Sequence, residues 1–414
     1  MNRRFFIKFL LSLGLGAYFP KLAEASQTET HQPQDGYKPL AVKFLRQIVT
    51  ADSTTSRVIM FQTDEKLSNV KLEYKMIGED AAQFAKVAED YFNQSNEPTF
   101  IYSCSLENLK PESLYNFRII SKDRATSWQN LRTAGNGNFQ MLIFSDSQCL
   151  DYSVWKRTAD TAAKNFPDAE IFAVNGDLVD NGQAAFQWRA WYSASKFVLH
   201  ERIFVPVMGN HECYSEQWLN CLPTGYLHHF RTPSNGNKKI GGYFYSFDYG
   251  AAHFFILNTQ FLELENFKST LQDAQEYWLK NDARTVNRRW KIVLMHKDIY
   301  NYAQDKFSDI GEIFMNMFDE LEIDLVLTGH LHTYRNRGKI FAQKKSERGT
   351  TYILCGRSGD QKYVEPHSDI DDVTFENLRT EPESYICLDI RADSINLIAK
   401  TVDGKILDNF TLEK

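Results

Sequence analysis

The sequence predicts an α/β fold preceded by an all-β domain, and two observations support this prediction. Between residues 40 and 133 the apolar runs are short and often alternate with polar positions, as expected for β-strands. After residue 138, strand-sized apolar runs alternate with segments of helical period, which is the rhythm of an α/β sheet. A chain of 414 residues with 43% hydrophobic and 24% charged residues can form two or three such globular domains.

The first 25 residues are expected to form an export signal rather than part of the fold. Arg3 and Arg4 precede an uncharged apolar run from Phe9 to Phe19, and Ala23-Glu24-Ala25 supplies the small residues of a cleavage site. This run is shorter than the roughly 20 residues that span a bilayer, so we expect no membrane span in the mature chain. An uncleaved anchor is the alternative. Residues 26–39 are polar and are expected to form a tether.

The start of the chain resembles a twin-arginine signal, which directs the export of folded proteins. The resemblance rests on residues 2–8, which read Asn-Arg-Arg-Phe-Phe-Ile-Lys. An ordinary secretory signal can also carry two arginines, so that pathway is an alternative. Both pathways predict a periplasmic, cell-surface or extracellular protein.

The mature chain is expected to be acidic. Removing the first 25 residues takes away four basic residues and one acidic residue, which changes the net charge from −6 to −9. Binding to nucleic acid relies on Lys and Arg that neutralise phosphates, so we expect no nucleic-acid partner. The six cysteines are scattered without a C-x-x-C pair. Cys213 with Cys221 is the most local disulfide candidate in an exported protein, and free buried thiols are the alternative.

Residues 40–133 are predicted to form a β-sandwich. The run Val58–Phe61 has the length of a strand, and apolar side chains alternate with polar ones between Tyr115 and Ile119. The stretch from Leu109 to Tyr115 resembles the tyrosine corner that opens a late strand of a fibronectin type III sandwich. The Gly- and Asn-rich residues 134–138 are expected to link this domain to the next.

The second domain is predicted to contain five main strands, at residues 141–144, 171–174, 203–208, 290–295 and 325–327. Apolar residues between Val154 and Phe166, and between Ile310 and Leu321, fall on one helical face and predict two core helices. Near the carboxyl terminus, residues 385–388 and 394–399 read as strands, and Asp403-Gly404 supplies a hairpin turn to a last strand.

A short polar cluster follows each of the five main strands. The clusters are Asp146-Ser147-Gln148, Gly176-Asp177-Leu178-Val179-Asp180, Gly209-Asn210-His211-Glu212, His296, and Gly329-His330-Leu331-His332. Each alone is a weak signal, since a lone His-x-His is usually a surface loop and a lone Gly-Asp a turn. Ligands of α/β sheets gather at the carboxyl ends of the strands, so the five clusters together predict one site. Carboxylates, carboxamides and imidazoles suit Mn, Fe, Zn or Mg.

The order D-x-Q, GDxxD, GNHE, H and GHxH resembles the calcineurin-like metallophosphoesterases. The preceding β-sandwich, residues 329–335 and residues 243–250 are similar to the purple acid phosphatase branch of that family. The resemblance covers residues 40–413 and implies a two-sheet αββα sandwich over residues 138–414. It implies two metal ions, Mn, Fe or Zn. The first ion would be held by Asp146, Gln148, Asp177 and His332, and the second by Asp177, Asn210, His296 and His330.

The resemblance also implies roles for neighbouring residues. His211 would act as the general acid, and Asp180 would orient its imidazole. Tyr334 and Arg335 are further candidates, for holding substrate. Asp180 stands where purple acid phosphatases have the tyrosine that binds Fe(III), so we expect no purple centre. Gln148 replaces a common histidine, so the first site is expected to bind loosely or to prefer Mn or Fe.

These observations give the hypothesis of an exported dinuclear phosphoesterase. It would hydrolyse small phosphomonoesters through a metal-bridging hydroxide, with His211 as the acid. A phosphodiesterase or nucleotidase using the same ions is the near alternative. A non-catalytic cell-surface binding protein is the alternative of another class. The sequence makes no prediction of the oligomeric state.

Overall fold

The computed structural model describes residues 36–95, 97–200, 202–235, 240–364, 366–375 and 381–414. The expected export signal and residues 26–35 of the expected tether lie outside these ranges. Among the described helices, none is both long enough and apolar enough to cross a membrane.

The largest sheet has ten strands. Their order is β26 (Ile406–Glu413), β25 (Ser394–Thr401), β24 (Ser384–Ile390), β11 (Phe139–Phe144), β12 (Ala169–Asn175), β13 (Ile203–Val207), β2 (Lys43–Ile48), β3 (Arg57–Thr63), β7 (Glu97–Leu106) and β6 (Ala88–Gln94). Strands β11, β12 and β13 are parallel to one another, and the C-terminal hairpin β25–β26 extends the sheet at one edge.

The described residues also form two further large sheets and a two-stranded ribbon. The second has the order β14 (Tyr245–Tyr249), β15 (Ala252–Leu257), β16 (Trp290–Met295), β19 (Leu325–Thr328), β22 (Thr350–Cys355), β20 (Tyr334–Phe341) and β21 (Lys344–Lys345), and β23 (Val373–Thr374) pairs with β20. The third has the order β1 (Lys38–Pro39), β9 (Arg124–Ala125), β8 (Leu114–Ser121), β4 (Val70–Met76) and β5 (Gln83–Lys86), and β10 (Gln129–Arg132) pairs with β8. A two-stranded ribbon joins β17 (Tyr300–Asn301) to β18 (Lys306–Phe307).

The helices cover the first two sheets. They are α2 (Ser153–Asn165), α3 (Ala185–Ala194), α4 (Lys196–Leu199), α5 (Thr224–His229), α6 (Phe261–Leu264), α7 (Leu271–Thr285) and α8 (Asp309–Glu320). Helices α2 and α8 match the two helical faces predicted from the sequence. Helix α8 starts at a conventional cap, because the hydroxyl of Ser308 accepts a hydrogen bond from Gly311 N at 3.2 Å.

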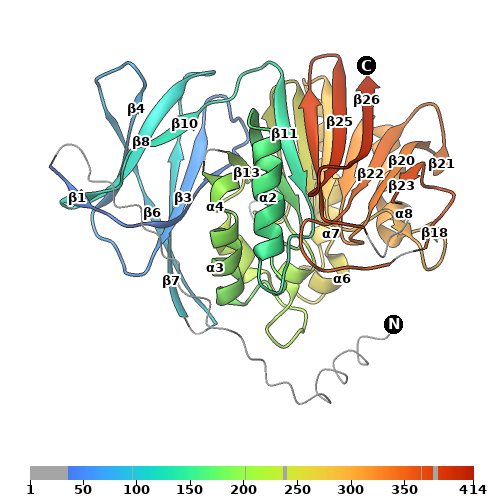
Figure 1. Ribbon diagram of the computed structural model, residues 1–414, viewed down its shortest axis with the longest axis horizontal. Helices are drawn as coiled ribbons and strands as arrows, with labels where there is room; N and C mark the ends of the chain where they lie inside the picture. The colour runs from blue at the N-terminus through green and yellow to red at the C-terminus, as the bar shows by residue number, and fades with distance from the viewer. Residues whose placement is uncertain (1–35, 96, 201, 236–239, 365, 376–380) are drawn as a thin grey trace.

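The α/β part has four layers, as the resemblance implied. Successive residues of β11 face two different cores, since strand side chains alternate between the faces of a sheet. Ile143 belongs to the core between the two sheets, with Leu294 of β16. Phe144 points to the helices and lies 5.0 Å from the ring of Trp155 in α2. On the far side, Phe255 of β15 packs against α7. Figure 1 shows α2 and α3 lying across the strands that follow the N-terminal sandwich.

The predicted N-terminal β-sandwich is present. Its core is formed by β3 and β7 of the ten-stranded sheet packed against β4, β8 and β10 of the third sheet. At its base, Lys110 N donates a hydrogen bond to the hydroxyl of Tyr115 at 2.8 Å, which is the contact of a tyrosine corner. The more specific assignment to the fibronectin type III class stays a prediction.

The sandwich and the α/β part share one sheet, which the sequence did not predict. Strand β2 pairs in parallel with β13, with Gln47 opposite Ile203 and Ile48 opposite Phe204. The expected linker is also partly fixed, because Ala134 is buried and its N–H donates to the carbonyl of Ser53 at 3.0 Å. The junction is therefore a continuous sheet and not a free connection.

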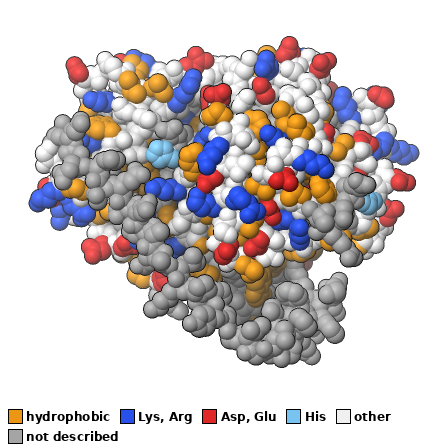
Figure 2. Space-filling view, in the orientation of Figure 1, with side chains coloured by type: hydrophobic (Ala, Val, Ile, Leu, Met, Phe, Trp, Pro, Cys, Tyr) orange, Lys and Arg blue, Asp and Glu red, His pale blue; other side chains and the backbone are white. Residues whose placement is uncertain are grey.

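All six cysteines are free thiols, and five of them are buried. Cys213 and Cys221 lie close in the backbone, since Cys221 N donates to Cys213 O at 2.9 Å, but they form no disulfide. Figure 2 shows Lys and Arg side chains interspersed with Asp and Glu on one face of the molecule, so the described residues of that face form no continuous basic stripe.

Candidate metal centre

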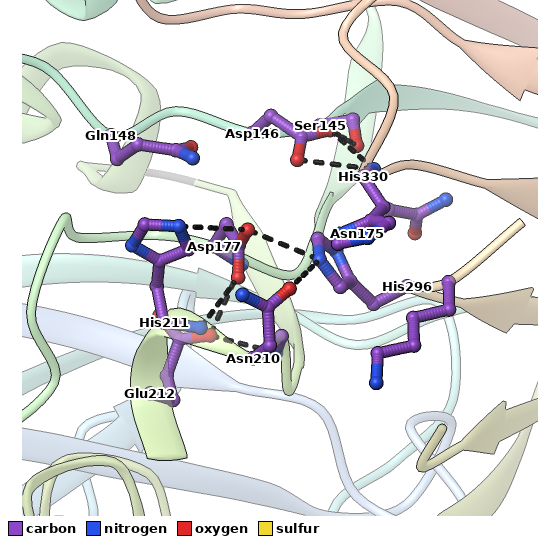
Figure 3. A network of polar contacts seen from close by, with 12 residues as sticks. Ser145, Asp146, Gln148, Asn175, Asp177, Asn210, His211, Glu212, His296 and His330 are labelled. Atoms are coloured by element: carbon purple, nitrogen blue, oxygen red, sulfur yellow. Dashed lines mark hydrogen bonds and ion pairs between the residues drawn. The ribbon is translucent and has the colours of Figure 1, made fainter. Parts of the chain in front are cut away.

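The five predicted polar clusters meet at one place between the two sheets. Asp146, Asp177 and Asn210 lie just past the carboxyl ends of β11, β12 and β13, and His296 and His330 lie just past β16 and β19. The strands within each set are parallel, so their carboxyl ends share one edge of each sheet. Figure 3 shows these five side chains directed toward one another.

Several candidate ligands have a left-handed backbone. The φ angles are +50° at Asp146, +51° at Asp177, +78° at His330 and +58° at His332. Residues other than glycine rarely adopt this region because the Cβ atom is crowded there, and such outliers concentrate at functional sites. The left-handed positions therefore coincide with four of the seven candidate ligands.

Two glycines of the motifs are required by close packing. Gly176 has φ +84°, and a Cβ atom at this position would lie 2.4 Å from Nδ1 of His296. A Cβ atom on Gly209 would lie 2.1 Å from Oδ1 of Asp177. Any side chain at either position would therefore displace a candidate ligand, which explains the glycine before both Asp177 and Asn210.

One group of candidate ligands surrounds Asp177, His296 and His330, whose ligand atoms all lie within 4.8 Å of one another. His296 Nδ1 donates to the carbonyl of Asn175 at 2.8 Å. Its Nε2 therefore faces Asp177 Oδ2 and Asn210 Oδ1, each at 3.1 Å. A hydrogen bond from the ring nitrogen that faces away from the cluster fixes the ring orientation that a metal ligand needs.

The other group, which corresponds to the first metal site, consists of Asp146, Asp177 and His332, again with ligand atoms within 4.8 Å of one another. His332 Nδ1 donates to the carbonyl of Gln361 at 2.9 Å, and its Nε2 lies 3.2 Å from Asp146 Oδ1. Asp177 belongs to both groups, which is the arrangement that a bridging carboxylate requires.

Gln148 lies beside the group of Asp146, Asp177 and His332, with its amide nitrogen 3.5 Å from Nε2 of His332. Its amide oxygen is buried and has no hydrogen-bond partner among the described residues. A buried unsatisfied acceptor costs about 1–3 kcal/mol, and a half-turn of the amide would direct this oxygen toward His332. The donor set therefore fits a metal ion, since imidazole nitrogen and carboxylate and amide oxygens converge without protein partners for all of them.

The electrostatics of the site favour a bound cation. Burial alone would raise the pKa of Asp177, but the His296 and His211 imidazoles more than offset this and hold that pKa well below its ordinary value. The buried carboxylate is thus ionised, which is the form in which a carboxylate binds a metal ion. Burial, with His296 nearby, lowers the pKa of His330 well below its ordinary value, so this imidazole is in the neutral form that binds metals.

Glu212 is a structural residue to which the sequence analysis assigned no role. Its buried carboxylate accepts hydrogen bonds from the backbone N–H groups of Gly209 at 2.7 Å, Leu178 at 2.9 Å and Asp177 at 3.1 Å. It thereby ties the loop after β12 to the loop after β13. Burial and the charge of Asp177 raise the pKa of Glu212 to about 7. The position of Glu212 in the GNHE cluster was the only signal available in the sequence.

His211 lies at the edge of this cluster, with its Nε2 3.8 Å from Asp177 Oδ2 (Figure 3). Its Nδ1 donates to the backbone carbonyl of Asp180 at 2.7 Å, whereas the Asp180 carboxylate is 3.6 Å away. The backbone carbonyl of Asp180 therefore lies closer to the imidazole than its carboxylate does. Burial lowers the pKa of His211, but Asp177 and Asp180 outweigh it and the net shift is upward.

Tyr334 and Arg335 were expected to hold substrate, but both side chains are engaged in contacts away from the cluster. Both side chains are buried in β20. The Tyr334 hydroxyl donates to Asp408 at 2.8 Å, and Arg335 donates to Asp371 at 2.6 Å. Sequence proximity to the last motif was misleading because the chain turns directly into a buried strand at this point.

Comparison with known proteins gives the same assignment for the central part of the chain. Residues 139–334 match the family model of the calcineurin-like phosphoesterases. This segment is therefore similar to the calcineurin-like phosphoesterases over the part of the chain that carries the five polar clusters. The match begins at the first residue of β11 and ends just after the last polar cluster.

Two plant proteins illustrate the similarity to curated relatives. The chain is 23% identical over 241 residues to the probable purple acid phosphatase 20 of Arabidopsis thaliana, and the alignment covers 55% of each chain. It is 29% identical over 213 residues to purple acid phosphatase 23 of the same plant, which covers 49% of this chain and 42% of the relative. The chain thus spans about half the length of these relatives.

Solved structures extend the similarity to nearly the whole described fold. Purple acid phosphatase PPD1 from yellow lupin (Lupinus luteus) superposes with a TM-score of 0.76 at 14% identity, covering 90% of this chain and 74% of the lupin chain. The structure of PhoD superposes with a TM-score of 0.62 at 12% identity, covering 91% and 90%. These likenesses confirm the predicted mixed α/β metallophosphoesterase fold.

Proposed function

We propose that the protein is a dinuclear metal-dependent phosphoesterase that hydrolyses phosphomonoesters. The observation that carries the proposal is the pair of ligand groups that share Asp177. Asp146, Gln148, Asp177 and His332 would hold one ion, and Asp177, Asn210, His296 and His330 the other. Mn, Fe or Zn suits this set of nitrogen and oxygen donors.

Two such ions, when bound, would supply Lewis-acid activation of the ester phosphorus and of water. The residues of the chain would do the rest. The Nδ1–H of His211 is anchored on the Asp180 carbonyl, so the Nε2 atom that faces the cluster is free to carry the transferable proton. His211 would therefore protonate the leaving oxygen as the phosphoester bond breaks.

The proposal is tested by replacing His211 with alanine. Loss of a general acid costs about 10²- to 10⁴-fold in rate, and the loss is greatest for leaving groups that need protonation. We expect His211→Ala to lower kcat strongly for an alkyl phosphate and much less for 4-nitrophenyl phosphate. The comparison uses metal-loaded protein, with His200→Ala as the control because His200 lies outside the cluster.

The same assay separates the alternatives. Activity on bis(4-nitrophenyl) phosphate exceeding that on the monoester would replace the monoesterase proposal with a phosphodiesterase. No hydrolysis of either compound by protein that holds its metal would favour the non-catalytic binding protein.

We further propose that residues 1–25 direct export through the twin-arginine pathway and that residues 26–39 form a tether. The paired arginines and the short apolar run support this. The proposed division is a fibronectin-like sandwich over residues 40–133 and a phosphoesterase domain over residues 138–414. Arg3→Lys with Arg4→Lys, compared with the natural chain for the site of cleavage and the cell fraction, tests the export signal. Unchanged export of the double variant would rule out the twin-arginine pathway.

A further inference from the structure

Three aromatic rings lie in contact on the side of the centre where His211 is placed. The His211 ring is 5.8 Å from the Tyr214 ring and 5.8 Å from the Trp218 ring, and is nearly perpendicular to both. The Tyr214 and Trp218 rings are 6.1 Å apart. Edge-to-face contacts of this kind hold rings in a defined arrangement. Trp218 therefore has a fixed place beside the imidazole that is proposed to protonate the leaving group.

Trp218 is half exposed, unlike its neighbour Tyr214. Tyr214 is buried, whereas Trp218 is 48% exposed and is followed by Leu219, which is 67% exposed. Apolar surface left in water forgoes about 25 cal/mol per Å² of stabilisation. Trp218 also has a left-handed backbone with φ +61°, which is strained for a bulky residue. Trp218 and Leu219 thus leave apolar surface exposed beside the cluster, and exposed apolar surface of this kind is typical of ligand-binding sites.

The loop that carries Trp218 is held in place by hydrogen bonds. Ser215 O accepts from Trp218 N at 2.8 Å and from the side-chain amide of Asn181 at 2.5 Å. Ser215 N donates to Leu219 O at 2.8 Å. Because Asn181 directly follows Asp180, the loop is tied to the segment that anchors His211. The indole is thus preorganised, and a ligand that stacks on it loses little loop entropy.

The charge of the loop at residues 213–222 indicates which kind of leaving group could lie against it. Residues 213–222 contain one acidic residue, Glu216, and no Lys or Arg. A leaving group with further phosphates would meet apolar and acidic surface here. A flat, uncharged ring would instead lie against the exposed indole face.

We propose that Trp218 is a stacking platform for an uncharged aromatic group on the leaving-group side, so that the substrates are phosphate esters of aromatic alcohols. The inference rests on the proposed function, because His211 defines the side on which the leaving group departs. Stacking of one ring on an aromatic side chain changes affinity by about 5- to 150-fold.

A matched pair of esters tests the proposal. Benzyl phosphate and cyclohexylmethyl phosphate have the same carbon skeleton and leaving alcohols of similar acidity, but only the benzyl group is flat. We expect Trp218→Ala to lower the benzyl-over-cyclohexylmethyl ratio of kcat/KM by at least about fivefold, and Trp218→Phe to retain most of it. Tyr277→Ala, which removes an exposed aromatic side chain from α7, should leave the ratio unchanged.

Equilibrium binding of benzylphosphonate and cyclohexylmethylphosphonate, measured by calorimetry, gives a second readout that requires no hydrolysis. An equal ratio in Trp218→Ala and the natural protein, by kinetics and by binding, would overturn the platform while leaving the phosphoesterase proposal intact. Binding of benzylphosphonate that depends on Trp218, in a protein that hydrolyses neither ester, would support the platform and reject the proposed hydrolysis.

Discussion

Gln148 is the residue that most distinguishes the first proposed metal site from the second. The second site contains two imidazoles, His296 and His330, whereas the first has only His332 and relies on the amide of Gln148. A neutral amide oxygen is a weaker donor to transition metals than an imidazole nitrogen. The first site should therefore release its ion more readily.

Replacing Gln148 with histidine should tighten the first site. We expect the apparent affinity for the more weakly held ion to rise by about tenfold, the lower end of the effects that ligand-shell changes produce. Competition with a chelator, followed by metal analysis, measures this affinity. Gln129→His in β10 is the control for an added histidine far from the cluster. Unchanged retention of the ion in Gln148→His would show that residue 148 is not a ligand.

At the scale of elements, the site depends on loops that are short and mutually fastened. Glu212 accepts hydrogen bonds from backbone groups of two different loops, which converts two flexible connections into one rigid unit. Its buried carboxylate is replaceable only by another acceptor of the same shape. Glutamine keeps the shape but places an amide N–H₂ donor against backbone donors.

Glu212→Gln should therefore destabilise the protein by about 1–3 kcal/mol, the cost of leaving buried donors unsatisfied. Hydrogen exchange should accelerate at the amides of Asp177, Leu178 and Gly209, which lose their acceptor. Glu216→Gln, at an exposed position, is expected to change stability by less than about 0.5 kcal/mol. Unchanged exchange at these three amides would refute the fastening role.

The strands and helices near the site were largely predictable from the sequence, whereas the contacts between them were not. Strand ends, glycines and the helices α2 and α8 follow from local patterns of apolar residues and turns. The roles of Glu212 and of the Asp180 carbonyl depend on contacts between segments that are 30 or more residues apart. A sequence pattern describes one segment at a time and therefore gives no information about contacts between distant segments.

For the whole molecule, the sequence did not predict that the N-terminal sandwich and the α/β part share one sheet. The pairing of Gln47 with Ile203 joins segments far apart in the chain, and no local pattern marks it. A second junction lies at Asp248, whose N–H donates to Ala51 O at 3.0 Å and whose carboxylate contacts His253 at 2.7 Å and Arg288 at 3.1 Å. His253 also contacts Asp282 of α7 at 3.3 Å.

This junction should make stability depend on pH. Burial lowers the pKa of His253, but Asp248 and Asp282 outweigh it and raise the pKa above its ordinary value. Protonated His253 therefore stabilises the fold. Its contribution is fully present below the unfolded-state pKa of about 6.5 and is lost as pH rises through the higher folded-state pKa.

The pH dependence is measured by denaturant unfolding of the natural protein and of His253→Gln, from below about pH 6.5 to above the folded-state pKa of His253. The difference in unfolding free energy between the two proteins should shrink as pH rises. A difference that stays constant, or grows, with rising pH would show that His253 is not protonated in the folded protein.

The metal content of purified protein tests the claim that two metal ions share Asp177. Mass-spectrometric analysis should find about two transition-metal ions per chain in the natural protein, in accord with a dinuclear site. Asp177→Asn, with its fold intact by circular dichroism, should lose both ions because the bridging carboxylate serves each of them. Retention of two ions in Asp177→Asn, or one ion or none in the natural protein, would contradict the claim.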